Sequence, residues 1–140
     1  MRFVYPYETD LEDGFILVQF PDIPEALTNV APGEDEAYIT HDCLIAVLGI
    51  YIEDRNPIPR PSPIRNRPVV TLDALESAKL ALAQAMMDQG ISNVALAKRL
   101  GVTEAIVRRL LDLDHRSHIG KVEQALKILG KRLQISVKAA

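Results

Sequence analysis

The side chains of this 140-residue chain that could do chemistry are mainly charged ones, and the two signs are separated along the sequence. Residues 1–56 contain twelve acidic and two basic side chains, whereas residues 57–140 contain fourteen basic and seven acidic ones. This asymmetry favours two surfaces with different partners, a basic partner for the first part and nucleic acid for the second. The alternative is two solvated surfaces without partners, and charge alone does not decide between them.

The acidic side chains near the N-terminus are dense enough to consider metal-dependent catalysis. Asp10, Glu12, Asp13 and Asp22 could hold two metal ions, as in a nuclease, so an RNA-cleaving enzyme is one hypothesis. However, the first three of these acids lie in one expected hairpin turn, where acids commonly solvate the bend. We therefore expect no catalytic residue here.

Other candidate ligands are scattered. The histidines at positions 41, 115 and 118 have no metal-ligand spacing with acids or with Cys43, so we expect no metal. We expect solvated imidazoles at His115 and His118, with an approach to phosphate as the alternative, and a core position for Cys43. The sequence contains no phosphate-binding loop, nucleophile elbow or dinucleotide fingerprint, so we also expect no cofactor.

The cellular setting follows from composition. The chain is 48% hydrophobic and 25% charged, as is typical of a folded globular protein, and its single cysteine excludes a disulfide framework. The N-terminus lacks a basic segment followed by an apolar one, and no apolar run approaches the ~18 residues of a membrane span. We expect a reducing, cytoplasmic setting.

The basic part contains two short expected helices, 93–100 and 104 to about 111, separated by Gly101. Ser92 and Thr103 can cap them, and glycine can supply the positive φ that the turn needs. These are the dimensions of a helix-turn-helix, whose second helix enters the major groove of DNA. A plain antiparallel helical domain is the alternative, but ten basic residues against four acids in 91–140 favour DNA.

Periodicity predicts which side chains of these helices face outward. Val107 and Leu110 face inward, whereas Arg108 and Arg109 stay outside. These two helices resemble the helix-turn-helix of phage repressors, and that resemblance places Glu104, Ala105 and Arg109 on the groove-facing side. We therefore expect Arg109 to read a base, because arginine pairs well with guanine, and Thr103 to contact phosphate. The expected DNA-binding residues are Ser92, Asn93, Thr103, Glu104, Ala105, Arg108 and Arg109.

The first 56 residues predict a small α+β domain. Alternation over 3–8 and the apolar run 15–20 predict two strands joined by a turn at Asp13-Gly14, and 26–30 predicts a third. A helix should follow Pro32-Gly33 and run to about Glu53. Five prolines between 57 and 68 then predict an extended linker between domains, so the expected organisation is 1–56, 57–68 and 69–140.

The third of these regions should be mostly helical. A short strand is expected at 69–71, a helix ending at Gly90 follows it, and a last helix ends at Gly130. Leu133, Ile135 and Val137 then alternate with polar residues, which predicts a terminal strand that needs a partner. Residues 69–71 are one candidate. The same segment of a second molecule is preferred, because a helix-turn-helix needs a dimer to place two helices about 34 Å apart.

In this order, the motifs resemble the HicB antitoxins of bacterial type II toxin-antitoxin systems, in the branch with a C-terminal helix-turn-helix. The matching features are Asp13-Gly14, the strand ending at Phe20, the segment 21–28, and 51–54 followed by the prolines of 58–63. Residues 92–111 also resemble phage-repressor helix-turn-helix domains. Residues 29–33 depart from the family, which has a short glycine-containing turn there.

The resemblance implies a partial ribonuclease H-like fold for residues 1–56, without working catalytic carboxylates, that blocks a small basic mRNA-cleaving toxin, HicA. The fold class is then an α+β N-terminal domain, with an antiparallel sheet and one helix, plus an all-α helix-turn-helix domain with a terminal strand. The acids expected at the toxin are Asp10, Glu12, Asp13, Asp22 and Glu25, and those expected at the dimer interface are Leu133, Ile135 and Val137.

The expected function is therefore an antitoxin that neutralises its toxin and represses its own operon by binding operator DNA as a dimer. Its partners would be the toxin, double-stranded DNA and a second copy of the chain, without a membrane. The alternatives are a transcriptional repressor whose N-terminal domain senses a small ligand, and an active RNA-cleaving enzyme.

Overall fold

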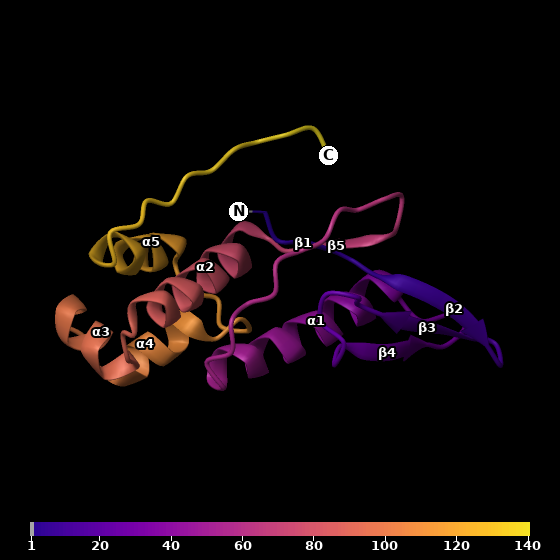
Figure 1. The fold of residues 1–140 in the computed structure, drawn as a ribbon, viewed down its shortest axis with the longest axis horizontal. Coiled ribbons are helices and arrows are strands. Elements are labelled where there is room, and N and C mark those ends of the chain that lie inside the picture. The colour runs from indigo at the N-terminus through magenta and orange to yellow at the C-terminus, as the bar shows by residue number, and fades with distance from the viewer. Residues whose placement is uncertain (1) are drawn as a thin grey trace. The chain divides into compact units, whose positions relative to one another are not determined.

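The computed structural model describes residues 2–140 and divides the chain into two compact units, which meet in the sequence between Asp73 and Ala74 (Figure 1). The first unit contains β1 (Val4–Pro6), β2 (Glu8–Glu12), β3 (Phe15–Gln19), β4 (Leu27–Val30), α1 (Glu36–Glu53) and β5 (Val69–Thr71). The second contains α2 (Ala74–Gln89), α3 (Asn93–Leu100), α4 (Glu104–Leu111) and α5 (Ile119–Ile128). The expected α+β class of the N-terminal part is confirmed.

The main sheet of the first unit is antiparallel, with strand order β2-β3-β4. The turn between β2 and β3 has φ values of 52° at Asp13 and 82° at Gly14. Positive φ at both central residues is the requirement of a type I′ hairpin turn, whose twist matches that of the strands. The predicted turn is therefore confirmed.

The register gives the sheet two unlike faces. Val18 and Val30 are buried on the face against which α1 packs, together with Leu44 and Leu48 of that helix. The helix begins where the side chain of Asp35 accepts a hydrogen bond from the N–H of Tyr38, at 3.2 Å. The opposite face carries the pairs Asp10–Leu17 and Glu12–Phe15. It has no helix of its own unit over it in Figure 1.

The proline-rich segment 57–68 differs from the expected linker, because it is part of the first unit. The Tyr5 hydroxyl donates to the carbonyl of Pro59 at 2.7 Å, and the N–H of Tyr7 donates to the carbonyl of Pro68 at 2.9 Å. Burial raises the pKa of Tyr5. Prolines lack a donor but keep their carbonyl acceptors, and donors elsewhere in the unit reach these. We refer to residues 57–68 as the proline strap.

Residues 69–71, which were expected in the second domain, also belong to the first unit. They form β5, which pairs antiparallel with β1 in the register Val4–Thr71 and Tyr5–Val70. Leu72 continues this edge by donating its N–H to the carbonyl of Phe3 at 3.1 Å. The units are therefore 1–73 and 74–140 instead of 1–56 and 69–140.

The helices of the second unit confirm the predicted bounds of 93–100 and 104–111. The Ser92 side chain accepts from the N–H of Ala95 at 3.1 Å, and Gly101 closes α3 with a φ of 69°. The core between the helices consists of small and aliphatic side chains, among them Leu82, Leu96, Ala97, Val107, Leu110, Val122 and Leu126.

The expected terminal strand is absent from the single chain over the described residues. Residues 131–140 have no regular secondary structure, and the side chain of Val137 is 94% exposed (Figure 1). The physical reason is that β5, its candidate partner within the chain, already pairs with β1. A strand without a partner would leave its backbone groups without the hydrogen bonds that stabilise it. Pairing with a second molecule stays a prediction.

Candidate interaction surfaces

The expected DNA-binding residues gather at two helix starts and along one side of α4. Thr103 stands at the start of α4 as its N-cap, and Arg108 and Arg109 are exposed near its end. Glu104 and Ala105 are half-buried between them, whereas Ser92 and Asn93 lie at the start of α3. The inward orientation predicted for Val107 and Leu110 is confirmed by their burial.

The two capping hydroxyls hold their helix starts and keep a proton to donate. Thr103 Oγ1 accepts from the N–H of Ile106 at 3.4 Å, as Ser92 Oγ does from Ala95. A hydroxyl that accepts one bond can still donate its hydrogen to a phosphate oxygen. The free N–H groups of a first helical turn suit an anion as well. Both helix starts are therefore chemically suited to phosphate.

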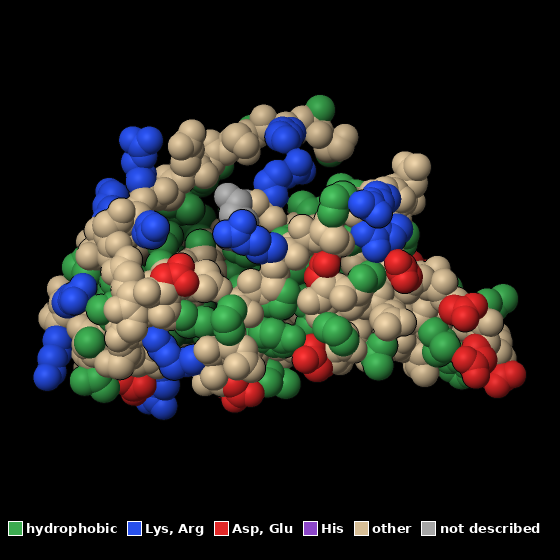
Figure 2. All heavy atoms as spheres, viewed as in Figure 1, with side chains coloured by type: hydrophobic (Ala, Val, Ile, Leu, Met, Phe, Trp, Pro, Cys, Tyr) green, Lys and Arg blue, Asp and Glu red, His purple; other side chains and the backbone are tan. Residues whose placement is uncertain are grey.

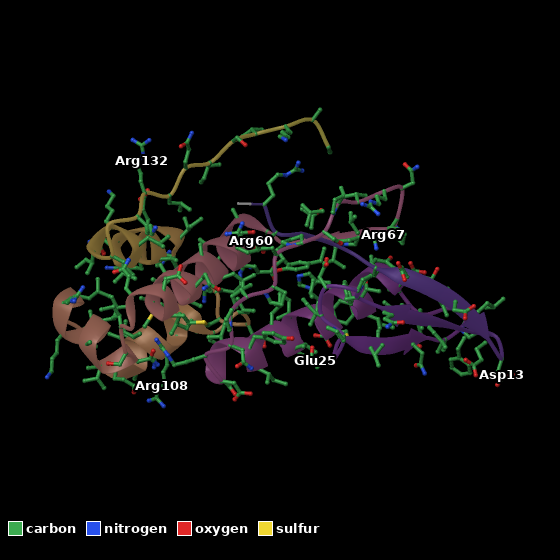
Figure 3. All side chains as sticks on the ribbon, in the orientation of Figure 1. Asp13, Glu25, Arg60, Arg67, Arg108 and Arg132 are labelled. Carbon is green, nitrogen blue, oxygen red and sulfur yellow. The ribbon has the colours of Figure 1, made fainter. Side chains whose placement is uncertain are left out.

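The two arginines of α4 differ in their surroundings. The Nε atom of Arg108 lies 3.0 Å from Oε2 of Glu104, one helical turn earlier (Figure 3 labels Arg108). Such exposed pairs contribute little energy, but this one brings an acid to the charge of Arg108. Within residues 2–140, Arg109 forms no ion pair, so its guanidinium stays open to an external acceptor.

The sequence patterns did not single out Lys79 of α2, whose side chain is fully buried. Its Nζ atom donates to three backbone carbonyls at the end of α4 and in the loop that follows. A signal was present, because Lys79 shares a three- and four-residue spacing with the apolar residues Leu82, Ala83 and Met86. A lysine within an apolar stripe needs internal acceptors.

The acids of the first hairpin lie together on the outward sheet face. Asp10 and Glu12 stand opposite Leu17 and Phe15, and Figure 3 places Asp13 at the hairpin tip. Phe15 is 40% exposed and Leu27, on the neighbouring strand, is 61% exposed. In Figure 2, acidic side chains gather beside apolar ones over this end of the sheet. We call the residues Asp10, Glu12, Asp13, Phe15, Leu17 and Leu27 the hairpin surface.

The two other expected acids have partners within their own unit. Asp22 Oδ2 accepts from the N–H of Ser62 at 2.9 Å and from its hydroxyl at 3.0 Å. Glu25 Oε2 accepts from the Tyr51 hydroxyl at 2.8 Å. This bond lowers the pKa of Glu25 and raises that of Tyr51. Asp22 therefore holds the proline strap, and Glu25 joins the turn after β3 to α1.

The remaining candidate ligands form no cluster. Among residues 2–140, no three His, Cys, Asp or Glu side chains come together in a group that could hold a metal ion. Nδ1 of His115 lies 2.8 Å from the hydroxyl of Ser117. Cys43 is half-buried, and its burial followed by the charge of Asp42 raises the pKa of its thiol. None of the helices between residues 2 and 140 combines the length and the apolar character of a membrane span.

Comparison with known proteins gives consistent matches. Residues 2–81 match the model of a family described as HicB-like antitoxins of bacterial toxin-antitoxin systems. The chain is 36% identical to Antitoxin HicB 2 of Photorhabdus laumondii, over 96% of this chain and 95% of the relative. It is also 36% identical to Antitoxin HicB of Pseudomonas fluorescens, over 100% and 97%. Identity to Antitoxin HicB of Escherichia coli K12 is 32%, over 91% and 93%.

The hydrogen bonds of Asp22 predict that its replacement by alanine loosens the proline strap. Loss of two hydrogen bonds costs roughly 1–2 kcal/mol, which raises the locally open population about 5–30-fold. Trypsin should therefore cut faster after Arg65, the one basic residue of the strap that no proline follows. Glu53→Ala, which removes an exposed acid of α1, serves as the control. Equal cleavage rates in both variants would show that Asp22 does not hold the strap.

Proposed function

The chain belongs to the HicB-like antitoxins of bacterial toxin-antitoxin systems, and on that premise we propose that it neutralises an mRNA-cleaving toxin of the HicA type and represses its own operon. An antitoxin is a regulatory protein and not an enzyme. The observation that carries the proposal is that the two compact units of the chain have opposite charge balances. The first unit has thirteen acidic and five basic residues, whereas the second has six acidic and eleven basic ones. The setting would be the bacterial cytoplasm, where mRNA and operator DNA are found.

The DNA-binding part of the proposal assigns α3 and α4 to a helix-turn-helix. Two eight-residue helices joined by Gly101, with Leu96, Ala97 and Val107 buried between them, support this assignment. The second helix then enters the major groove with Arg109 toward a base and Thr103 toward a phosphate. Ser92 and Asn93 approach the backbone from the start of α3.

The toxin-binding part of the proposal assigns a partial ribonuclease H-like fold to the first unit and its contact to the hairpin surface. A nuclease that binds RNA needs a basic surface for the phosphates. The acids Asp10, Glu12 and Asp13 would complement that surface, and Phe15 and Leu27 would supply apolar area at its centre. Asp22 and Glu25 already accept hydrogen bonds from Ser62 and Tyr51 of their own unit. A toxin that contacts these two acids would have to bind them alongside these partners.

The dimer part of the proposal assigns an antiparallel pairing of the terminal segment to two copies of the chain. A two-fold axis makes the segment 131–138 self-complementary, with Leu133, Ile135 and Val137 on one face. The exposure of two of them in the single chain supports the assignment, because Ile135 is 63% exposed and Val137 more so, whereas Leu133 is half-buried. A dimer would present two copies of α4 to successive turns of DNA.

Arg109→Ala should weaken operator binding by ~1–3 kcal/mol and relax specificity at one base pair, because a bidentate arginine contact is lost. Gel-shift titration of the operator and its single-base variants measures both quantities. Lys127→Ala, which removes one charge from α5, is the matched control and should weaken binding of all sequences alike. Unchanged sequence preference in the arginine variant contradicts the assigned base contact.

Reversal of Asp10, Glu12 and Asp13 to lysine should slow association with the toxin at least about tenfold at low salt and less at high salt, because exposed charges steer encounter. Stopped-flow mixing at several salt concentrations measures this dependence. The matched control reverses the three exposed acids Asp42, Glu53 and Asp54 of α1 and its end. If both triple variants slow association equally, net charge is responsible and the hairpin surface is not the contact.

Deletion of residues 131–140 should lower both the mass in solution and the operator affinity, while toxin neutralisation survives. The reason is that the deleted segment supplies the dimer contact and no part of the hairpin surface. Light scattering, gel shift and an RNA-cleavage assay measure the three properties. Exchange of Gln134 and Ser136 for alanine, on the other face of the segment, should leave them unchanged. A truncated protein that remains a dimer and binds the operator normally overturns the assignment.

A further inference from the structure

Lys79 is a lysine without solvent contact, because its side chain in α2 is 0% exposed. An ammonium group that leaves water loses strong hydration, and only well-placed acceptors compensate for this loss. The partners of Lys79 therefore indicate what the side chain does.

Four acceptors of this ammonium lie within nine residues of one another along the chain. Nζ lies 2.9 Å from the carbonyl oxygen of Arg109, 2.6 Å from that of Asp112 and 2.7 Å from that of His115. It also lies 3.0 Å from the hydroxyl oxygen of Ser117. These groups belong to the last turn of α4 and to the loop that leads to α5. One ammonium group from α2 is therefore hydrogen-bonded to acceptors along the whole segment 109–117.

The end of α4 needs such a cation because it lacks the closure that the other helices have. A residue with positive φ follows each of them: Arg55 after α1, Gly90 after α2, Gly101 after α3 and Gly130 after α5. After α4, Asp112 instead has extended backbone, with φ −78° and ψ 112°. The last carbonyls of a helix have no donor within it, and a left-handed residue usually helps to supply donors.

The position of the charge is favourable as well. The carbonyl end of a helix carries a partial negative charge, and a cation there is stabilising. The ammonium of Lys79 thus supplies both the hydrogen bonds and the charge that α4 lacks at its end. It does so from α2, which packs against α4 and α5 in the same unit.

We propose that Lys79 is a positioning residue for DNA recognition, which fixes the backbone of Arg109 and thereby the direction in which its side chain leaves α4. The effect on DNA rests on the proposed function. Arg109 lies in the last turn of α4, where a helix without closure frays first. Loss of the ammonium removes the shortest hydrogen bond to the Arg109 carbonyl, which is then held by the 3.3 Å bonds from the Asp112 N–H and the Ser117 hydroxyl. Discrimination between bases then falls, while the charge of the DNA-facing surface stays the same.

The test compares Lys79→Met, which keeps chain length and loses the ammonium, with Val122→Ala in full-length protein. Val122 of α5 is fully buried, so its truncation destabilises the same unit without removing an acceptor or donor of the 109–117 segment. Both are measured at a temperature where circular dichroism shows each variant folded. We expect Lys79→Met to lose at least tenfold in the ratio of operator to non-specific affinity, and Val122→Ala to change it less than twofold. Equal losses in the two variants would overturn the positioning role and leave only a contribution to stability.

Chemical rescue provides the second arm. Lys79→Cys in a Cys43→Ala background is alkylated while unfolded with 2-bromoethylamine, so that the thiolate sulfur displaces bromide and gains an aminoethyl group. This restores an ammonium at nearly the length of lysine. Alkylation with 1-bromopropane gives a neutral side chain of the same size. We expect the aminoethyl form to recover the affinity ratio and the propyl form not to recover it. If both folded forms recover it, or neither does, the proposal is wrong.

Hydrogen exchange separates this proposal from the proposed function. The N–H of Asp112 donates to the carbonyl of Arg109, and that of His115 donates to the carbonyl of Asp112. Both amides should exchange at least tenfold faster in Lys79→Met than in Val122→Ala, because the lost ammonium opens this segment locally whereas the smaller core residue only lowers the stability of the whole unit. If the unmodified protein shows no operator preference, the proposed function fails and these exchange rates alone decide whether Lys79 holds the segment. Unchanged exchange in Lys79→Met contradicts the proposal under either outcome.

Discussion

The irregular segments of this protein depend on distant side chains that satisfy their backbone groups. A buried or packed backbone needs hydrogen-bond partners, and neither the proline strap nor the end of α4 can supply them locally. Tyr5 reaches the carbonyl of Pro59, Asp22 reaches the N–H of Ser62, and Lys79 reaches three carbonyls of the segment 109–117. These contacts turn two segments without regular structure into fixed parts of their units. The proline strap is thereby packed into the acidic unit, and the end of α4 is fixed by hydrogen bonds within the basic unit.

The parts of the fold that could be predicted are those whose causes are local. The hairpin follows from Asp13-Gly14, which tolerates positive φ, and α3 and α4 follow from the caps Ser92 and Thr103 with a glycine between them. The strap could not be predicted, because its partners are 40 and 54 residues away in the sequence. The periodicity of 131–138 is real, but a strand needs a partner that the single chain does not offer.

The residues of the candidate surfaces also divide into those that local sequence predicts and those that contacts with distant residues determine. The exposure of Arg108 and Arg109 follows from helical periodicity, which is a property of the sequence. The separation of the five expected acids into three on the hairpin and two within the unit follows from contacts with Ser62 and Tyr51. Charge counts treat all five alike, since they contain no information about partners. Lys79 was not predicted as a buried residue, because its charge is typical of the surface. Its spacing, however, places it in the apolar stripe of α2.

The junction of the two units bears on how an antitoxin could act on toxin and DNA at once. A proline linker of twelve residues would separate the two activities mechanically. The strap instead belongs to the acidic unit, and only Leu72 and Asp73 stand between β5 and α2. Leu72 is itself buried and hydrogen-bonded to Phe3, which continues the pairing of β5 with β1. Any rotation of one unit against the other must therefore occur at the few backbone dihedrals of Leu72 and Asp73. A rotation too large for these dihedrals would disturb the β1–β5 pair. On the proposed function, this short junction would be the covalent connection between a toxin-binding unit and an operator-binding unit.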